Sequence, residues 1–396
     1  MSEALAVHGG PPVRACLLPY GRQRIEEDDI RAVVEALRSD FITTGPVVAE
    51  FERCFAERVA ARYAVAVSSG TAALHAACFA AGIGPGDEAI TTPLTFVATS
   101  NAVLYLGGRP VFGDIRSDTL NLDPALLASR VTPRTKAIIP VHFAGQPCDL
   151  AAIQAEARDR GLTIIEDAAH ALGAEYQDRP IGSLSDLTVF SLHPVKHLTT
   201  GEGGVVTTND AALAERLRRF RNHGLSVGSA ERQARGLLYA DMVDLGFNYR
   251  LTDFQCALGL SQLGRLDAIL ARRTAIAERY RSDLKDLPGL ALPATSDGMR
   301  HAWHIFPVLI DLERLSVDRE TVFAALRAEN IGVVLHYVPA YWHSYYARLG
   351  FRRGLCPRAE AIAERILTLP IFPAMTDGDI DDVIVALRKV LAYYLR

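Results

Sequence analysis

The chain has 396 residues, 49% of them hydrophobic and 22% charged, with a formal net charge of −4. This length exceeds one compact core and predicts one large and one smaller domain. The slight acidity gives no basis for nucleic-acid binding, and no apolar run is long enough for a membrane span. The first residues lack the apolar core of a signal peptide. Six scattered cysteines, without a CxxC pair or a cysteine–histidine cluster, predict buried thiols and no metal site. We therefore expect a cytoplasmic protein.

Most of the chain alternates helix-like and strand-like segments. Residues 25–40, IEEDDIRAVVEALRSD, place apolar residues at helical spacing behind acidic ones. Helical stretches such as TAALHAACFAAG and DLAAIQAEARDRG separate short β-rich runs. These runs are YAVAVSSG, EAITTP, RPVFGDI, KAIIPVHF, LTIIEDA, LTVFSLH and GGVVTTN. The alternation predicts an α/β domain with a mostly parallel central sheet.

The pattern changes near residue 265, where a long arginine-rich helix, a WHIFPVLIDL strand and later amphipathic helices follow. We therefore expect a large domain over residues 20–264 and a smaller α+β domain over 265–396, with residues 1–19 packed near the latter.

Three groups of polar residues follow predicted strands of the large domain. They are Gly70–Thr71 before a helix, Asp167 with His170, and Ser191 through Lys196. In open α/β sheets, ligands bind beyond the carboxyl ends of the strands, so we expect these groups to meet. Each also has a structural interpretation: the residues around Gly70 are typical of a helix cap, and Asp167 is typical of an N-cap for a following helix, with His170 one turn further on.

Lys196 decides between these interpretations. The chain has only four lysines, at positions 136, 196, 285 and 389. The other three lie in a turn or on charged helices, whereas Lys196 follows a strand among His, Thr and Gly. A desolvated lysine has a lowered pKa and can attack a carbonyl. Lysine for an aldehyde, aspartate for a ring nitrogen and a helix N-terminus for a phosphate together indicate pyridoxal 5′-phosphate (PLP).

The sequence resembles the DegT/DnrJ/EryC1/StrS family of PLP-dependent sugar aminotransferases over nearly its whole length. The motifs that carry this resemblance are SDFITTGPVVAEFE, SSGTAALHAA, GPGDEAITTPLTFVATSNAV, IEDAAHALGA, FSLHPVKHLTTGEGGVV and LGFNYRLTDFQCALG. The resemblance implies the aspartate-aminotransferase fold (PLP fold type I), and a homodimer whose subunits share active sites.

The resemblance also assigns roles to particular residues. It implies that Lys196 links covalently to the cofactor, Asp167 pairs with its ring nitrogen and His170 lies near its phenolic oxygen. The remaining cofactor contacts would be a stacked Phe96, the phosphate ligands Ser191, Gly70 and Thr71, and Asn248 reaching the neighbouring subunit's cofactor. Phe96 in an apolar strand is also typical of core, and Asn248 of an ordered loop.

The resemblance implies transfer of an amino group from L-glutamate to a nucleotide-linked keto sugar. Short stretches such as PYGRQ favour C4 of a UDP-linked 4-keto-6-deoxy-HexNAc, as in pseudaminic acid biosynthesis. Perosamine-type and 4-amino-arabinose-type acceptors are alternatives, as is a regulator that binds PLP or the sugar nucleotide without turnover. Substrate contacts are expected from Tyr20, His193, Arg250, His336 and Tyr337, although an aromatic-rich stretch is equally typical of core.

Overall fold

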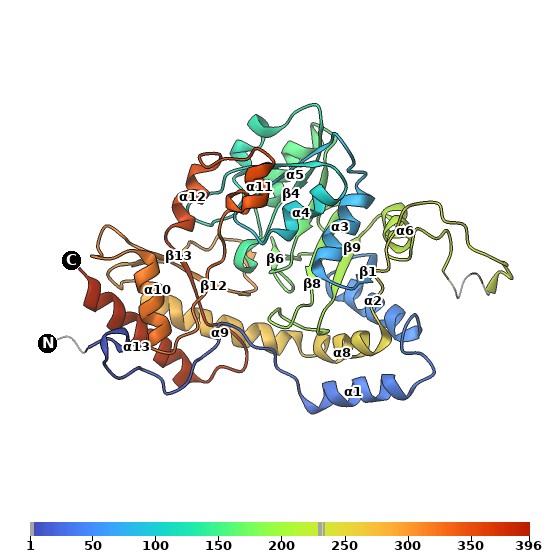
Figure 1. The fold of residues 1–396 in the computed structure, drawn as a ribbon. Coiled ribbons are helices and arrows are strands. Elements are labelled where there is room, and N and C mark those ends of the chain that lie inside the picture. Colours follow the sequence, from blue (N-terminus) through green and yellow to red (C-terminus); the bar gives the residue numbers. More distant parts are fainter. Residues whose placement is uncertain (1–3, 229–231, 233) are drawn as a thin grey trace.

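The computed structural model describes residues 4–228, 232 and 234–396 (Figure 1). Its largest element is a seven-stranded sheet in the order β1-β9-β8-β5-β4-β2-β3. β9 is antiparallel to both its neighbours, and the other six strands run in one direction. The strands are β1 (Tyr63–Val67), β2 (Glu88–Thr91), β3 (Arg109–Phe112), β4 (Thr135–Ile139), β5 (Thr163–Asp167), β8 (Leu187–Ser191) and β9 (Gly204–Thr208).

Helices cover both faces of this sheet. Alternate strand residues point into two separate hydrophobic clusters: Ile164 and Phe190 pack with α2, α5 and α8, while Ile165 and Val189 pack with α3, α4 and α6. A parallel sheet buried on both faces explains why its strands are nearly continuous apolar runs. These helices are α2 (Pro46–Arg58), α3 (Gly70–Ala80), α4 (Ala98–Tyr105), α5 (Leu150–Arg158), α6 (Ala211–Phe220) and α8 (Asp253–Leu263); α1 (Glu27–Arg38) packs on α8.

The C-terminal part forms its own layer, seen in orange and red in Figure 1. An antiparallel sheet of β10 (Leu290–Ala291), β12 (Phe306–Ile310) and β13 (Ile366–Leu369) shares one hydrophobic cluster with α9 (Leu266–Leu284), α10 (Arg319–Ala328) and α13 (Asp377–Tyr394). Leu5 and Leu18 belong to this cluster. The α/β class is therefore confirmed, whereas the domain boundary at residue 265 stays a prediction, because α9 contributes to the cores of both parts.

The remaining elements are small. A second antiparallel sheet joins β11 (Met299–Arg300) to β6 (Glu175–Tyr176) and β7 (Arg179–Pro180). Short helices α11 (Ser344–Arg348) and α12 (Pro357–Ala363) lie where the two parts meet, and 3-10 turns occur at Ala6–His8, Pro124–Leu126, Ala128–Arg130, Phe143–Gly145 and Ala340–Trp342. In the described ranges, we find no helix long and apolar enough to cross a bilayer.

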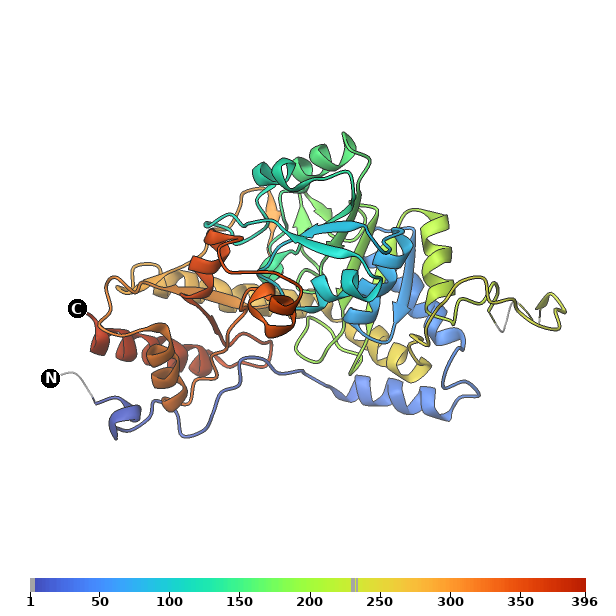
Figure 2. The same ribbon diagram turned by 45° about the horizontal axis from the view of Figure 1, so that its top comes forward.

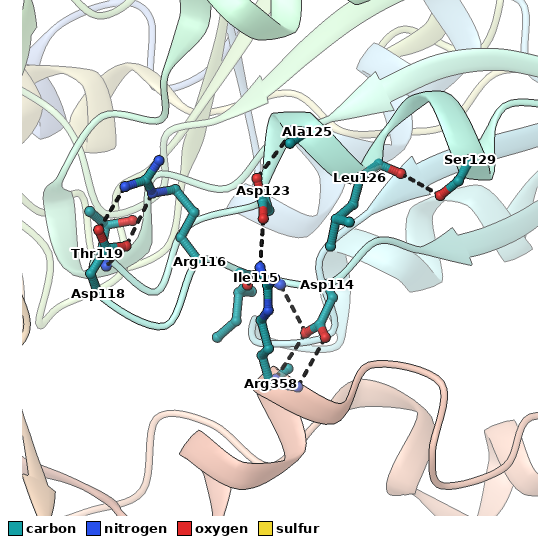
Figure 3. Close-up of polar contacts among 11 residues, drawn as sticks. Asp114, Ile115, Arg116, Asp118, Thr119, Asp123, Ala125, Leu126, Ser129 and Arg358 are labelled. Carbon is teal, nitrogen blue, oxygen red and sulfur yellow. Dashed lines mark hydrogen bonds and ion pairs between the residues drawn. The ribbon is translucent and has the colours of Figure 1, made fainter.

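Asp114 joins the two parts of the molecule (Figure 3). Its buried carboxylate accepts hydrogen bonds from the backbone N–H groups of Ile115, Arg358 and Ala359, each at 2.9 Å. Two of these donors lie in the first turn of α12, whose N–H groups have no partner within the helix. The side chain of Arg358 then donates to Asp123 at 2.6 Å. A helix of the C-terminal part is thus capped by the large sheet's own loop.

Candidate active site

The three groups predicted to meet do lie at the same edge of the large sheet. β5 ends at Asp167, its neighbour β8 ends at Ser191, and α3 begins at Gly70 beside them. A Cβ atom on Gly70 would lie only 2.9 Å from the Ser191 Cβ, so glycine is what allows this close approach. Parallel neighbours bring their carboxyl ends together, which is why residues distant in sequence converge here.

Asp167 is buried and held by two hydrogen bonds. Thr99 on α4 donates its hydroxyl to Oδ2 at 2.7 Å, and the Ala169 N–H donates to Oδ1 at 3.1 Å. Burial nevertheless raises the carboxyl pKa, because these bonds and the charge of Lys196 offset desolvation only in part. A cation placed beside this carboxylate would restore its charged form.

One local expectation was wrong: no helix follows Asp167 in the described chain. Residues 168–174 form turns instead, with Ala171 N–H donating to the Ala168 carbonyl. Gly173 adopts φ +83° and packs against Leu270, a conformation that ends any helix. Asp167 is therefore not the N-cap of a helix, and His170 is placed by a tight turn.

Lys196 lies in the loop after β8 and is half-buried. Its Nζ is 3.3 Å from Nε2 of His304, in the segment before β12. Burial lowers the Lys196 pKa to about 8; the charge of Asp167 opposes this shift and that of Arg273 adds to it. A substantial fraction of this amine is thus neutral near pH 8, as a nucleophile or proton acceptor requires.

Histidines surround Lys196. The rings of His170 and His304 lie 4.4 Å apart, and the Tyr337 hydroxyl is 3.1 Å from His170 Nε2. Desolvation lowers the pKa of His170 and His304 well below the usual value and that of His336 to about 4, with the charge of Lys196 adding to each shift. These rings are therefore neutral at neutral pH. The Nδ1 atoms of His170 and His304 are buried without a hydrogen-bond partner in the described structure.

The start of α3 fits a phosphate. Ser69 is the N-cap, and its side chain accepts from the Ala72 N–H. The Gly70 and Thr71 N–H groups precede the first intrahelical donors, so they remain oriented toward an anion at the helix N-terminus. With Ser191 in contact, Asp167 at the neighbouring strand end and buried ring nitrogens left unpaired, these residues match the phosphate, ring nitrogen and aldehyde of PLP.

Five residues complete the predicted set and lie further out. Phe96 is 58% exposed, with its ring 6.4 Å from that of Tyr337, so the core interpretation of Phe96 does not hold. The Tyr20 ring is 5.5 Å from that of His336, at the rim of the histidine cluster. His193 is exposed. Asn248 is also exposed and pairs with Asn222 at the base of the segment between α6 and α8, described parts of which extend away from the body in Figures 1 and 2. Arg250 donates to Asn222 at this base at 2.7 Å.

The sequence reasoning missed Thr99, His304 and Arg273. Thr99 lies within the quoted motif PLTFVATSN, and His304 comes just before a strand, but neither reveals its partner locally. Arg273 did carry a signal. It continues the apolar stripe of α9 formed by Leu266, Leu270, Ala277, Tyr280 and Leu284, and a charge on such a stripe predicts burial.

Comparisons with known proteins agree with this geometry. A model of the DegT/DnrJ/EryC1/StrS aminotransferase family matches residues 23–388. The spore coat polysaccharide biosynthesis protein SpsC of Bacillus subtilis is 45% identical over 377 residues, covering 94% of this chain and 97% of SpsC.

Solved structures are also similar. PseC of Helicobacter pylori, an aminotransferase involved in the biosynthesis of pseudoaminic acid, has a TM-score of 0.89 at 29% identity, covering 96% of this chain and 100% of PseC. Spr1654 of Streptococcus pneumoniae gives 0.89 in its PLP form, covering 96% of this chain and 100% of Spr1654, and 0.90 in its PMP form, covering 95% and 99%. Both forms are 30% identical to this chain.

Proposed function

We propose that this chain, which belongs to the DegT/DnrJ/EryC1/StrS aminotransferase family, aminates C4 of a UDP-linked 4-keto-6-deoxy-HexNAc with L-glutamate as donor. Its family and its structural neighbours make it a PLP-dependent sugar aminotransferase of the expected fold. The observation that carries the catalytic part is the Lys196 amine, with its pKa lowered to about 8, facing Asp167 at the carboxyl ends of β5 and β8. The acceptor rests on the likeness to PseC and on the short motifs around Tyr20 and Lys196.

The chain's own residues have separable tasks in this reaction. PLP, when bound, supplies a carbonyl carbon that links to amines and a ring that takes up an electron pair. Lys196 Nζ would anchor the cofactor and, once free, would accept the proton from the donor's α-carbon for transfer to the carbonyl carbon that PLP supplies. Asp167 holds the proton of the ring nitrogen, and Thr99 fixes that carboxylate. His170, oriented by Tyr337, packs against His304, the ring that contacts Lys196, and it is neutral, so it adds no competing charge.

The two half-reactions share these groups. In the first, L-glutamate loses its amino group and leaves as 2-oxoglutarate; in the second, the keto sugar receives that group. A pocket lined by Lys196 and His197 also contains the arginines Arg22, Arg24, Arg265 and Arg272. This positive lining suits a diphosphate-linked sugar, although Arg24, Arg265 and Arg272 are already paired with carboxylates.

We infer that the active unit is a dimer. The described segment around Asn248 exposes large apolar side chains, with Leu238 94%, Leu245 78% and Tyr239 72% exposed. Such a patch is typical of a protein interface. Mixing inactive Lys196→Ala with inactive Asn248→Ala subunits should restore activity if each site takes Asn248 from the other copy, and no recovery would contradict shared sites.

The function is tested by absorbance spectroscopy of the PLP-loaded protein. The visible band of the bound cofactor should change when L-glutamate is added and return when the correct 4-keto sugar nucleotide follows. Lys196→Ala should show neither change. A panel of UDP-, GDP- and TDP-linked 4-keto sugars, including perosamine and 4-amino-arabinose precursors, identifies the acceptor. A wild-type spectrum that is indifferent to glutamate and to every other amino donor would favour the non-catalytic regulator.

A further inference from the structure

Arg273 is buried in the protein, only 1% exposed, yet no described carboxylate is paired with it. Its guanidinium donates only to backbone carbonyls. Nη1 donates to the Trp303, His304 and Ile371 oxygens at 3.1, 3.0 and 3.2 Å, and Nη2 donates to the Val195 oxygen at 3.3 Å. Burying a cation this way is costly, so its position demands a reason.

Three of the four carbonyls that Arg273 binds belong to the two segments that meet at Lys196; the fourth, of Ile371, follows β13. Val195 directly precedes Lys196, and His304 supplies the ring nitrogen 3.3 Å from Lys196 Nζ. Arginine's planar fork binds two acceptors in a fixed relative geometry. One guanidinium therefore ties the loop after β8 to the segment before β12. These two segments carry Lys196 and His304, whose side chains are in contact.

The charge of Arg273 acts on the same amine. The groups facing Lys196 are Asp167 on β5, Arg273 on α9 and the histidines at 170, 197, 304 and 336. Burial raises the pKa of Asp167 and lowers the pKa of each of the four histidines. Burial lowers the pKa of Arg273 to about 10, which leaves it charged at neutral pH. Asp167 favours the protonated amine, whereas Arg273 is the positive charge that opposes it.

We propose that Arg273 is a positioning residue for Lys196: it holds the Val195 and His304 backbones together, and its unpaired charge favours the neutral amine. Burial is the larger influence on this amine, and Arg273 adds to it, so Lys196 can give up its proton although a carboxylate lies nearby. This inference rests on the proposed role of Lys196, but it concerns the protein without cofactor and is measured there.

The test uses the scarcity of lysines in this chain. The PLP-free protein is pulsed with an acylating reagent across a pH series, and mass spectrometry reads the labelling of each lysine, with exposed Lys136 and Lys285 as internal references. Arg273→Gln should raise the Lys196 midpoint from about 8 by about one pH unit. Arg279→Gln, an exposed position on the same helix, should leave it unchanged. A folded Arg273→Gln protein with the wild-type midpoint overturns the electrostatic part.

A second variant covers the case in which Arg273→Gln does not fold. Arg273→Lys keeps the charge but loses the fork, so backbone hydrogen exchange should rise about tenfold in residues 193–199 and 302–306 and stay unchanged in 357–363. Exchange at the wild-type rate in all three segments of Arg273→Lys would overturn the positioning role. Neither readout depends on turnover, so a protein that binds no PLP contradicts the proposed function and leaves these measurements intact.

Discussion

Two arginines show how differently this chain uses the same side chain. Arg358, at the start of α12, is exposed and donates to the Asp123 carboxylate while its backbone is capped by Asp114 (Figure 3). Arg273 is buried and bonds to carbonyls alone. At the first site charge is neutralised locally and joins two parts of the fold. At Arg273 the positive charge has no carboxylate partner, and it favours the neutral form of the nearby Lys196 amine. Of these two arginines, the unpaired buried one lies beside the candidate active site and the paired one holds two parts of the fold together.

Substitution of Lys196 should have the largest effect on activity. Lys196→Arg keeps a positive charge in place but cannot release a proton or form the cofactor link. We expect turnover to fall by at least about a thousandfold. Steady-state amination assays with the same variant of Lys285 as control measure this. Appreciable residual activity in Lys196→Arg would mean that another residue moves the proton.

Acid should affect the two regions unequally. Histidines at 170, 197, 304 and 336 have folded pKa values below the unfolded value of 6.5. The unfolded state thus binds more protons as pH falls through 6.5, so their contribution is complete above that pH and is lost below it. Each of these histidines should contribute about 1.3 kcal/mol, so we expect the four to lose about 5 kcal/mol of stability between about pH 7 and pH 5.5.

Urea unfolding at a series of pH values checks this total, and hydrogen exchange locates it. Exchange should increase first in residues 302–306 and later in 357–363. A stability that is flat down to about pH 5.5 would contradict the neutral histidine cluster.

Matched substitutions of the two arginines compare how much each contributes to the free energy of unfolding. Arg273→Gln leaves carbonyls of buried segments without a donor, which should cost about 3 kcal/mol. Arg358→Gln removes an exposed ion pair worth less than about 1 kcal/mol. Both are measured by denaturant unfolding of the PLP-free protein. Equal losses would show that burial of Arg273 carries no special energetic weight.

Asp114 refines the structural half of the comparison. Asp114→Asn replaces one of the two acceptor oxygens that receive three backbone N–H groups with a donor, and we expect a loss of about 2 kcal/mol with unchanged cofactor binding. Unfolding curves and PLP titration are read together, with Asp118→Asn, an exposed carboxylate in the same loop, as control. Loss of PLP affinity in Asp114→Asn would mean that this contact also shapes the active site.

Much of this molecule could be predicted from its sequence because the signals were local. Apolar runs identified each strand of the large sheet, and the few polar residues that follow β5 and β8 predicted the candidate site, including Asp167 and Lys196. The helix expected after Asp167 failed because Gly173 and its packing on Leu270 override the helical preference of an alanine-rich stretch. His304 was out of reach, since its contact with Lys196 joins residues 108 positions apart. The burial of Arg273 could be predicted from its place on the apolar stripe of α9, but its carbonyl partners, which are distant in the sequence, could not.

The most direct measurement is the pH dependence of acylation at Lys196 in the wild-type, PLP-free protein, with Lys285 in the same sample as reference. We expect a midpoint for Lys196 near 8, below the ordinary lysine value of 10.5. A Lys196 midpoint at the ordinary lysine value of 10.5 would contradict the claim that this lysine is kept in the chain for its neutral amine.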